Sequence, residues 1–486
     1  MQRTTLLLTV SLLLIPTTQL IAQNVDRPNV VLMMADDQGW GETSYNGHPF
    51  LKTPNQDEMA ATGLRFDRFY AAAPVCSPTR ASVLTGRHPN RSGVFSPNHS
   101  TRPEEITIGQ ILRTAGYRTA HFGKWHVGAV KKESPTNPGW GGFEEWLSHD
   151  NFFEMHPPLS RNGGDPTKYR GDSSNIIVDA AIEFLTRVRS VGEDPFFVVI
   201  WFGSPHSPYR GLAEDVGLFP EVKGEELKHR FAEITAMDRS IGRFRQSLRD
   251  MNVADNTLLW YTSDNGMTVE GIPTQQRGQQ TNGGLRGKKG TLYEGGLKVP
   301  GIIEWPAMIK QPRSTSVPCV TSDIFPTLLS LLKLKSPDTT RPIDGVDLSS
   351  LILRTNEGTG PLQMKRPPIG FWKYNKGRET KNERWMPAEL TKGTTPTTRN
   401  PGIDFVNFKH PVAKTKDFGG ESAWLTDQFK LVYNSKKRTV QLFDITNDPL
   451  EKSDLSQSKP DVVRSLKAAM FEWQKSVEVS LTGADY

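Results

Sequence analysis

Three continuous apolar runs stand out along the chain, and each ends abruptly in polar residues. The runs cover Asn29–Ala35, Pro195–Phe202 and Thr257–Thr262. Uninterrupted runs of this length are typical of strands that are buried on both faces of a parallel sheet. The polar residues behind them therefore meet at one carboxyl edge, where open α/β sheets bind ligands. These residues are Asp36 and Asp37, the segment Ser204-Pro205-His206, and Asp264 and Asn265.

Segments with apolar residues three and four positions apart lie around these runs and predict amphipathic helices. They cover Thr107–Thr114, Asn175–Val188, Phe231–Met251 and Asp323–Leu332. Strands that alternate with helices predict an α/β fold. We expect a large mixed, mostly parallel sheet sandwiched by helices.

The pattern changes in the last third of the chain. Residues 337–411 are rich in Pro, Thr, Gly, Lys and Arg and predict long surface loops around a domain junction. Phe429–Tyr433 and Thr439–Asp444 then alternate as the strands of a hairpin, and Asp461–Val477 predicts a closing helix. We therefore expect a main domain over residues 24–355 and a smaller C-terminal α+β domain, with an antiparallel sheet, over residues 356–486.

The first 23 residues have the layout of a secretory signal peptide. Arg3 precedes an apolar run from Leu6 to Ile15, and Pro16 and a polar stretch follow it. The run is shorter than the roughly 20 apolar residues that cross a bilayer. We expect an exported protein, periplasmic or extracellular, with no stable membrane anchor.

The charge composition argues against nucleic acid as a partner. The chain has 59 Lys and Arg against 53 Asp and Glu, a net charge of +6, and the excess is scattered rather than gathered in blocks. This mild excess suits an anionic substrate. The chain has only 2 cysteines, Cys76 and Cys319, so its stability must come mainly from core burial.

Cys76 lies at the start of a predicted helix, in the sequence Cys-Ser-Pro-Thr-Arg-Ala-Ser-Val-Leu-Thr-Gly-Arg. Pro78 suits a first helical turn, and Arg80 lies one turn beyond Cys76. A lone cysteine is more often a small buried hydrophobic residue. This motif, however, resembles the signature of the type I sulfatases, the formylglycine-dependent, arylsulfatase-like branch of the alkaline phosphatase superfamily. The resemblance implies that a formylglycine-generating enzyme converts Cys76 to formylglycine, whose hydrated aldehyde is the nucleophile.

The polar residues at two of the strand ends form a candidate metal site. Asp36, Asp37, Asp264 and Asn265 are hard oxygen ligands, which favour Ca²⁺, with Mg²⁺ as the alternative, over zinc. Taken singly, each pair would be explained as well by a loop or a tight turn. The resemblance implies that these four residues and the formylglycine oxygen at Cys76 hold the cation.

Two further motifs contain candidate basic residues, two lysines and a histidine. Lys124 and His126 follow a predicted strand over Tyr117–Phe122, and in extended chain their spacing would point both side chains the same way. The segment Gly287–Gly296 resembles the sulfatase loop Gly-Lys-Gly-Thr-x-Tyr-Glu-Gly-Gly, and alignment on its second glycine selects Lys289.

The resemblance assigns roles to these residues. It implies that Lys124 and Lys289 bind sulfate, that Arg80 helps to offset its charge, and that His126 is the base that helps to expel it. His206 would bind sulfate and protonate the leaving oxygen. Ser148 would add a minor hydroxyl contact, for which Asp150 and Asn151 are alternatives.

The substrate is the least determined feature. Aromatic rings between Pro367 and Pro411 can stack on sugars while neighbouring cations meet anionic groups, which favours a sulfated glycan. Packing between the two domains explains these residues nearly as well. The rings and cations are Trp372, Tyr374, Trp385, Lys373, Lys376, Arg378 and Arg384.

Two other functions compete with a sulfatase. A metal-dependent phosphatase or phosphodiesterase of the same superfamily would use zinc, several histidine ligands and a Thr or Ser nucleophile, which these motifs do not offer. A secreted glycan-binding protein without catalysis would leave the joint presence of nucleophile, cations and metal ligands unexplained.

Overall fold

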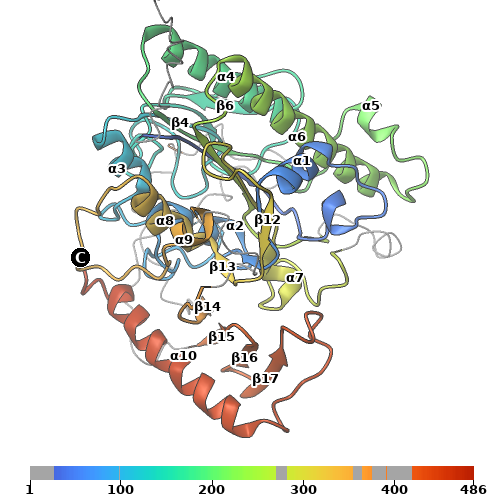
Figure 1. The fold of residues 1–486 in the computed structure, drawn as a ribbon, viewed down its shortest axis with the longest axis vertical. Helices are drawn as coiled ribbons and strands as arrows, with labels where there is room; N and C mark the ends of the chain where they lie inside the picture. The colour runs from blue at the N-terminus through green and yellow to red at the C-terminus, as the bar shows by residue number, and fades with distance from the viewer. Residues whose placement is uncertain (1–26, 98, 270–281, 354–363, 375–389, 391–418) are drawn as a thin grey trace, which may run out of the picture.

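A ten-stranded sheet forms the centre of the molecule (Figure 1). The computed structural model describes residues 27–97, 99–269, 282–353, 364–374, 390 and 419–486, so the predicted signal peptide lies outside the described residues. The strands are, in spatial order, β12 (Arg313–Thr315), β2 (Leu64–Phe66), β11 (Gly301–Glu304), β9 (Thr257–Ser263), β1 (Asn29–Ala35), β8 (Phe196–Trp201), β4 (Arg118–Lys124), β5 (Glu145–His149), β6 (Pro158–Arg161) and β7 (Thr167–Lys168).

The middle of this sheet is parallel. β1 pairs in parallel with β8 and β9, and β4 pairs in parallel with β8 and β5. The pairs that β11 makes, and those that β6 makes, are antiparallel. The sheet is therefore mixed with a parallel centre, as the apolar runs predicted.

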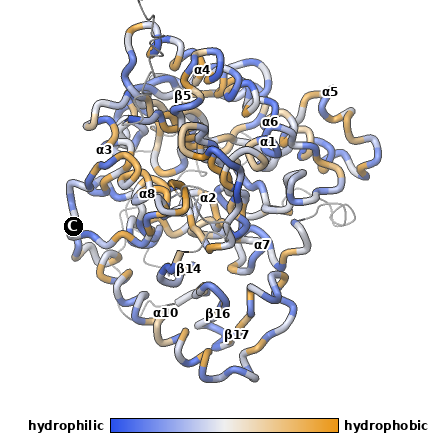
Figure 2. Tube along the Cα trace, viewed as in Figure 1, coloured by the Kyte–Doolittle hydropathy of each residue, from blue (hydrophilic) through white to orange (hydrophobic). Residues whose placement is uncertain are grey.

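Helices cover both faces of the sheet because its central strands are apolar on both sides. Val30, Leu32 and Met34 of β1 pack in one core cluster, and the residues between them pack in the other. Figure 2 shows the hydrophobic residues concentrated in the interior and the polar ones on the outer turns of the helices. One face carries α2 (Cys76–Thr85), α3 (Ile108–Thr114), α8 (Ile324–Leu331) and α9 (Ser349–Ile352), and the other α1 (Pro54–Thr62), α4 (Ser173–Val191) and α6 (Glu225–Asp250).

Short elements complete the main domain. A second sheet has three two-residue strands in the order β10 (Lys298–Val299), β3 (Phe69–Tyr70) and β13 (Cys319–Val320). The remaining helical turns are η1 (Ser44–Asn46), α5 (Ala213–Val216), α7 (Glu294–Leu297) and η3 (Thr321–Asp323). In the part of the chain that the structure describes, no helix is long and apolar enough to cross a membrane.

The C-terminal part is an antiparallel sheet closed by a long helix (Figure 1). Its strands run in the order β14 (Ile369–Tyr374), β15 (Gly420–Leu425), β16 (Phe429–Asn434) and β17 (Thr439–Asp444), and α10 (Pro460–Leu481) packs on them. Residues 337–411, where the sequence predicts long surface loops around a domain junction, also contain the short helix α9 and the strand β14. The alternating Ile369 and Phe371 are buried against the main domain, but flanking Pro and Lys residues hide this short pattern.

Trp372 belongs to this junction and is only 5% exposed. It packs with Phe95, Val477 and Leu481, and its ring lies 6.4 Å from that of Trp473 in α10. The prediction that Trp372 stacks on a sugar is therefore wrong, and the alternative of packing between domains holds. Trp385, Lys376, Arg378 and Arg384 lie outside the described residues.

Candidate active site

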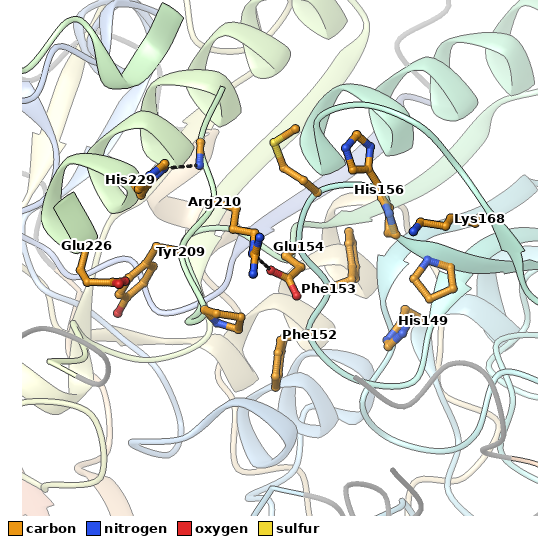
Figure 3. A pocket seen from close by; sticks show the side chains of 15 residues that line it. His149, Phe152, Phe153, Glu154, His156, Lys168, Tyr209, Arg210, Glu226 and His229 are labelled. Atoms are coloured by element: carbon orange, nitrogen blue, oxygen red, sulfur yellow. Dashed lines mark hydrogen bonds and ion pairs between the residues drawn. The ribbon is translucent and has the colours of Figure 1, made fainter. Parts of the chain in front are cut away.

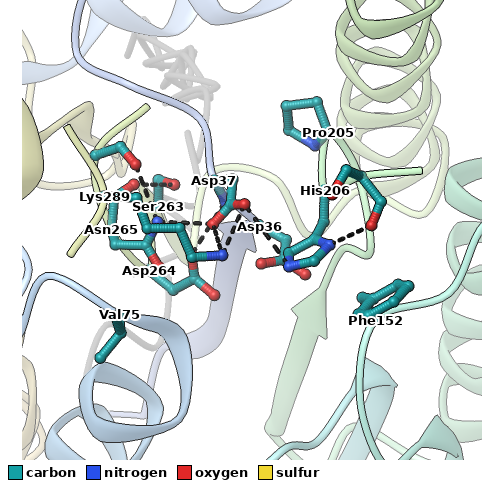
Figure 4. Close-up of polar contacts among 12 residues, drawn as sticks. Asp36, Asp37, Val75, Phe152, Pro205, His206, Ser263, Asp264, Asn265 and Lys289 are labelled. Atoms are coloured by element: carbon teal, nitrogen blue, oxygen red, sulfur yellow. Dashed lines mark hydrogen bonds and ion pairs between the residues drawn. The ribbon is translucent and has the colours of Figure 1, made fainter. Parts of the chain in front are cut away.

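Four neighbouring strands bring the predicted site residues to one place (Figure 4). Asp36 and Asp37 follow β1, Asp264 and Asn265 follow β9, Lys124 ends β4, and His206 lies in the loop after β8. Because β9, β1, β8 and β4 are adjacent in the sheet, their carboxyl ends converge. The backbone of Asp37 is left-handed, with φ of 71°, an unfavourable conformation that is common at functional sites.

Cys76 faces this edge of the sheet from the first turn of α2 and is 2% exposed. Its sulfur and carboxylate oxygens of Asp36 and Asp264 all lie within 4.8 Å of one another. Burial raises the pKa of the thiol, against the opposing charge of Lys124. The N-terminus of a helix also favours negative charge, so residue 76 lies where an anion is stabilised.

Three cations neutralise the acidic residues. Lys124 Nζ lies 2.7 Å from Asp36 Oδ2, and Lys289 Nζ lies 2.7 Å from Asp37 Oδ1. Arg80 donates through Nε and Nη2 to Asp264 Oδ2, at 3.1 and 2.7 Å, and is fully buried. Arg80 therefore orients a carboxylate of the cluster instead of pointing only at Cys76.

These charges set the pKa values of the carboxylates. Burial and the negative charge of Asp36 raise the pKa of Asp264 to about 6. Burial acts in the same direction on Asp37, but Lys289 and His206 outweigh it and lower the pKa of that carboxyl.

The cluster fits a hard cation. Asp36 Oδ1 and Asn265 Oδ1 are buried and accept no hydrogen bond from any residue that the structure describes. Asn265 donates its Nδ2 to Asp37 Oδ1 at 2.7 Å and to Gly266 O at 3.0 Å, which leaves its oxygen as the free acceptor. Buried polar atoms without partners are costly, and a cation would satisfy both.

His206 lies on the other side of Asp37. Its Nδ1 donates to the carbonyl of Ser207 at 2.6 Å, and its Nε2 lies 3.7 Å from Asp37 Oδ2. The ring of Phe152 stacks on the imidazole at 4.3 Å (Figure 4). Burial and the charge of Lys289 lower the pKa of His206 to about 3.

His126 reaches the site by a different local geometry from the predicted one. β4 ends at Lys124, and His126 is left-handed, with φ of 58°. Lys124 and His126 are therefore not aligned by extended chain, and that part of the prediction is wrong. Burial and the nearby charges of Lys124 and Arg80 lower the pKa of His126 well below its usual range.

Ser148 is the predicted site residue whose hydroxyl is engaged in the core. Its Oγ lies 2.7 Å from His121 Nδ1 and donates to the carbonyl of His121 at 3.3 Å. The alternative Asp150 accepts a hydrogen bond from the backbone of Val130 at 2.6 Å. Ser148 Oγ and Asp150 Oδ1 are thus both hydrogen-bonded to neighbouring residues of the chain.

Arg230 of α6 is a supporting residue that the sequence did not reveal. It is fully buried and donates to the carbonyls of Asp37, at 2.8 Å, and of Pro205, at 2.7 Å. Its ion pair with Glu42 has a distance of 2.7 Å. The sequence could have revealed it, because Arg230 lies among the apolar positions of the predicted helix, beside Phe231.

Comparisons with known proteins agree with this arrangement. The family model described as Sulfatase matches residues 28–334, more than half of the chain. The N-acetylgalactosamine-6-sulfatase of Mus musculus is 31% identical over 387 residues, which cover 72% of this chain and 69% of that protein. Human arylsulfatase A is 32% identical over 69% of each chain.

A solved structure shows the same fold. It is that of Ps i-CgsB in complex with k-i-k-neocarrahexaose, with a TM-score of 0.74, 24% identity and 93% of each chain covered. At this identity the likeness establishes the fold alone. The family match and the two sulfatase relatives go further: the chain belongs to the sulfatase family, the sulfuric ester hydrolases of the alkaline phosphatase superfamily.

Proposed function

We propose that the protein hydrolyses a sulfate ester of a carbohydrate, with Cys76 converted to formylglycine and Ca²⁺ as the bound metal. The observation that carries this proposal is the position of Cys76, whose side chain lies within 4.8 Å of two carboxylates at a point lined by buried cations. The residues proposed as nucleophile, metal ligands and anion-binding groups thus lie close together, which supports the proposal. The metal would be held by Asp36, Asp37, Asp264 and Asn265, with Mg²⁺ as the alternative ion.

The proposed reaction needs two groups that the amino-acid sequence does not itself supply, a bound metal ion and the hydrated aldehyde at residue 76. Bound Ca²⁺ supplies positive charge that offsets the charge of sulfate, and the hydrated aldehyde supplies a hard oxygen nucleophile in place of a thiol.

The lysines of the site bind the anionic substrate. Lys124 donates to Asp36 and Lys289 to Asp37, so sulfate oxygens placed beside these carboxylates would meet both ammonium groups. Fixed cations in a buried site cost no reorganisation during the reaction, which makes them effective there.

His206 is suited to proton transfer at the leaving oxygen. Its Nδ1 hydrogen is held by Ser207 O, so Nε2 is the nitrogen that exchanges a proton with the reacting group. Burial and the charge of Lys289 lower the pKa of His206 in the protein without substrate, and the negative charge of a bound sulfate would raise it, so that Nε2 can carry the proton for the leaving oxygen. Stacking against Phe152 fixes the ring plane. His126, among the same cations, is the proposed base for the step that releases sulfate.

Relatives support a carbohydrate as the substrate. The mouse relative is named for N-acetylgalactosamine-6-sulfate, and the Ps i-CgsB structure contains an oligosaccharide. From the predicted signal peptide, the proposal includes export from the cytoplasm. From the Cys76 motif, it includes a formylglycine-generating enzyme as the partner that converts Cys76. The four proposed ligands, Asp36, Asp37, Asp264 and Asn265, all offer oxygen, and His206 is the one histidine grouped with them among the described residues, which argues against the zinc-dependent phosphatase with its several histidine ligands.

The mass of the peptide that contains residue 76 tests the proposal. We expect protein from its native host to carry an aldehyde at this position, while Cys319, which is also buried, stays a thiol in the same digest. Cys76→Ala should abolish sulfate release with little change in stability, and Cys319→Ala serves as the matched control. Fully active protein with only a thiol at residue 76 would refute the mechanism.

A further inference from the structure

A pocket of about 820 Å³ opens beside the candidate active site (Figure 3). This volume lies in the upper part of the range of about 300–1,000 Å³ for small-molecule sites. Phe152 belongs to both the candidate active site and the pocket, because its ring stacks on His206 and also lines the pocket. Since His206 is the proposed acid for the leaving oxygen, the leaving group of the substrate lies on this side.

Two loops form facing walls of the pocket. One follows β5 and carries Glu154, and the other follows His206 and carries Arg210. Arg210 Nε and Glu154 Oε2 meet at 2.7 Å between these walls (Figure 3). The Arg210 side chain is nevertheless 65% exposed.

The backbone beneath Arg210 is fixed. The N–H of Arg210 donates to Glu233 Oε1 at 2.5 Å, and the N–H of Gly211 donates to His229 Nδ1 at 3.1 Å. Both acceptors belong to α6, a helix of the main domain. A fixed backbone with an exposed guanidinium is a preorganised arrangement for binding a ligand.

The charged side chains that line the pocket are balanced. Arg210 and Lys168 are cationic, and Glu154 and Glu226 are anionic. Hydroxyl groups both donate and accept hydrogen bonds, so alternating charged donors and acceptors suit a polyhydroxylated ligand. Because the two carboxylates offset the two cations, the pocket offers an anionic ligand no net attraction, whereas a neutral polyhydroxylated ligand meets both donors and acceptors.

We propose that this pocket is a subsite for uncharged sugar rings that adjoin the sulfated position, and that the Arg210–Glu154 pair binds their hydroxyls. Its size suits more than one ring, so the preferred substrate is an oligosaccharide with a neutral neighbour to the sulfated sugar. This inference rests on the proposed function. If the protein cleaves a carbohydrate sulfate, the sugar in this pocket is part of the alcohol that leaves.

Binding of sugars without sulfate tests the subsite independently of catalysis. Galactotriose, cellotriose and N,N′,N″-triacetylchitotriose are titrated calorimetrically into the metal-loaded protein, beside trigalacturonic acid as the anionic counterpart of galactotriose. We expect at least one neutral trisaccharide to bind, and trigalacturonic acid to bind more weakly than galactotriose. Failure of all three neutral sugars to bind, or tighter binding of trigalacturonic acid, would overturn the proposal.

Variants of the ion pair then locate the binding site. Arg210→Ala and Glu154→Gln should each weaken the bound neutral sugar roughly tenfold, the usual effect of losing a hydrogen bond to a charged group. Arg464→Ala is the matched control, because this arginine pairs with Asp461 on the exposed surface of α10. Unchanged affinity in both pocket variants would also overturn the proposal.

Kinetics separate the subsite from the sulfatase assignment. Both pocket variants should lose more kcat/KM on a sulfated oligosaccharide than on 4-nitrophenyl sulfate, which is too small to fill the pocket. Equal losses on both substrates would count against the subsite. If wild-type protein with an aldehyde at residue 76 releases sulfate from none of the esters, the proposed function is refuted. The titrations with unsulfated sugars would still decide whether the subsite exists.

Discussion

Asp264 and Lys289 lie in the same cluster but have different surroundings. Asp264 binds the Arg80 guanidinium through Oδ2 and accepts from the backbone N–H of Asp37, at 3.1 Å, through Oδ1. Lys289 approaches from the opening of the site, with its side chain 14% exposed, and contacts Asp37 alone among the predicted ligands. Their replacement should therefore separate metal binding from substrate binding.

We expect Asp264→Ala to lose both bound metal and activity, and to cost about 3 kcal/mol of stability because Arg80 stays buried with only the more distant carboxylate of Asp36, at 3.9 Å, as its anionic partner. Lys289→Ala should keep the metal but lose most sulfate release. Elemental analysis of the purified variants, with an assay of sulfate release, measures both effects. Stoichiometric metal in Asp264→Ala would contradict the assignment of this ligand.

Sequence alone predicted which residues converge, but not how each is oriented. Asp36, Asp264 and His206 could be found because each follows an apolar run, and parallel strands bring their ends together. The left-handed backbone of His126 could not, since it lies in the loop after β4, next to the residue whose N–H bonds at 2.8 Å to His149 O, at the end of the neighbouring strand β5. Burial of Trp372 likewise depends on contacts with α10, far along the chain.

At the scale of elements, α6 holds two loops of the site together. Through Arg230 it binds the turn that contains Asp37 and the loop that contains His206. The guanidinium also lies over the ring of Tyr209, 5.3 Å from its centroid. Asp37, a proposed metal ligand, and the loop of His206, the proposed proton donor, thus share one anchor.

We expect Arg230→Lys to weaken metal binding about 10- to 100-fold, as is usual when partners of metal ligands are lost, because one ammonium cannot reach both carbonyls and Glu42. Calorimetric titration of Ca²⁺ measures this effect, and kcat at saturating Ca²⁺ should also fall. Arg249→Lys, at the exposed end of the same helix, is the control. Unchanged Ca²⁺ affinity in Arg230→Lys would show that α6 does not position the site.

Elements with a strong pattern of their own were predictable. The runs of β1, β8 and β9 and the helices α3, α4 and α10 lie where the sequence placed them, with ends moved by a few residues. α6 begins at Glu225, ahead of the predicted start, because its first turns carry few apolar residues. Strands of two or three residues, such as β3 and β13, carry no periodicity and are defined by their partners alone.

At the scale of the whole molecule, the C-terminal sheet supports the loop that carries Lys289. Lys373 of β14 donates to the carbonyl of Gly290 at 2.6 Å, next to Lys289. Further along this loop, Tyr293 donates to Gln441 of β17 at 2.6 Å. The two parts of the chain therefore build one site, although the predicted ligands all belong to the first.

A fully buried lysine also links the two parts. Lys430 of β16 lies 3.0 Å from Glu294 and 3.1 Å from Glu451, and Glu294 begins α7, directly after the loop of Lys289. The hydroxyl of Tyr70 also donates to Glu294, at 3.0 Å. Removal of the ammonium would leave two buried carboxylates facing each other.

We therefore expect Lys430→Met to lower the free energy of unfolding by about 3–5 kcal/mol, the usual cost of breaking a buried ion pair. Because Glu294 ties the Lys289 loop to the C-terminal sheet, kcat of the folded variant should fall while the bound metal is retained. Lys437→Met, in the exposed turn of the same hairpin, should change neither quantity. Pairing Lys430→Met with Glu451→Gln should recover part of the lost stability, since it removes one of the two buried charges. Differential scanning calorimetry with metal analysis measures these effects, and an unchanged unfolding temperature in Lys430→Met would show that the two domains are held together elsewhere.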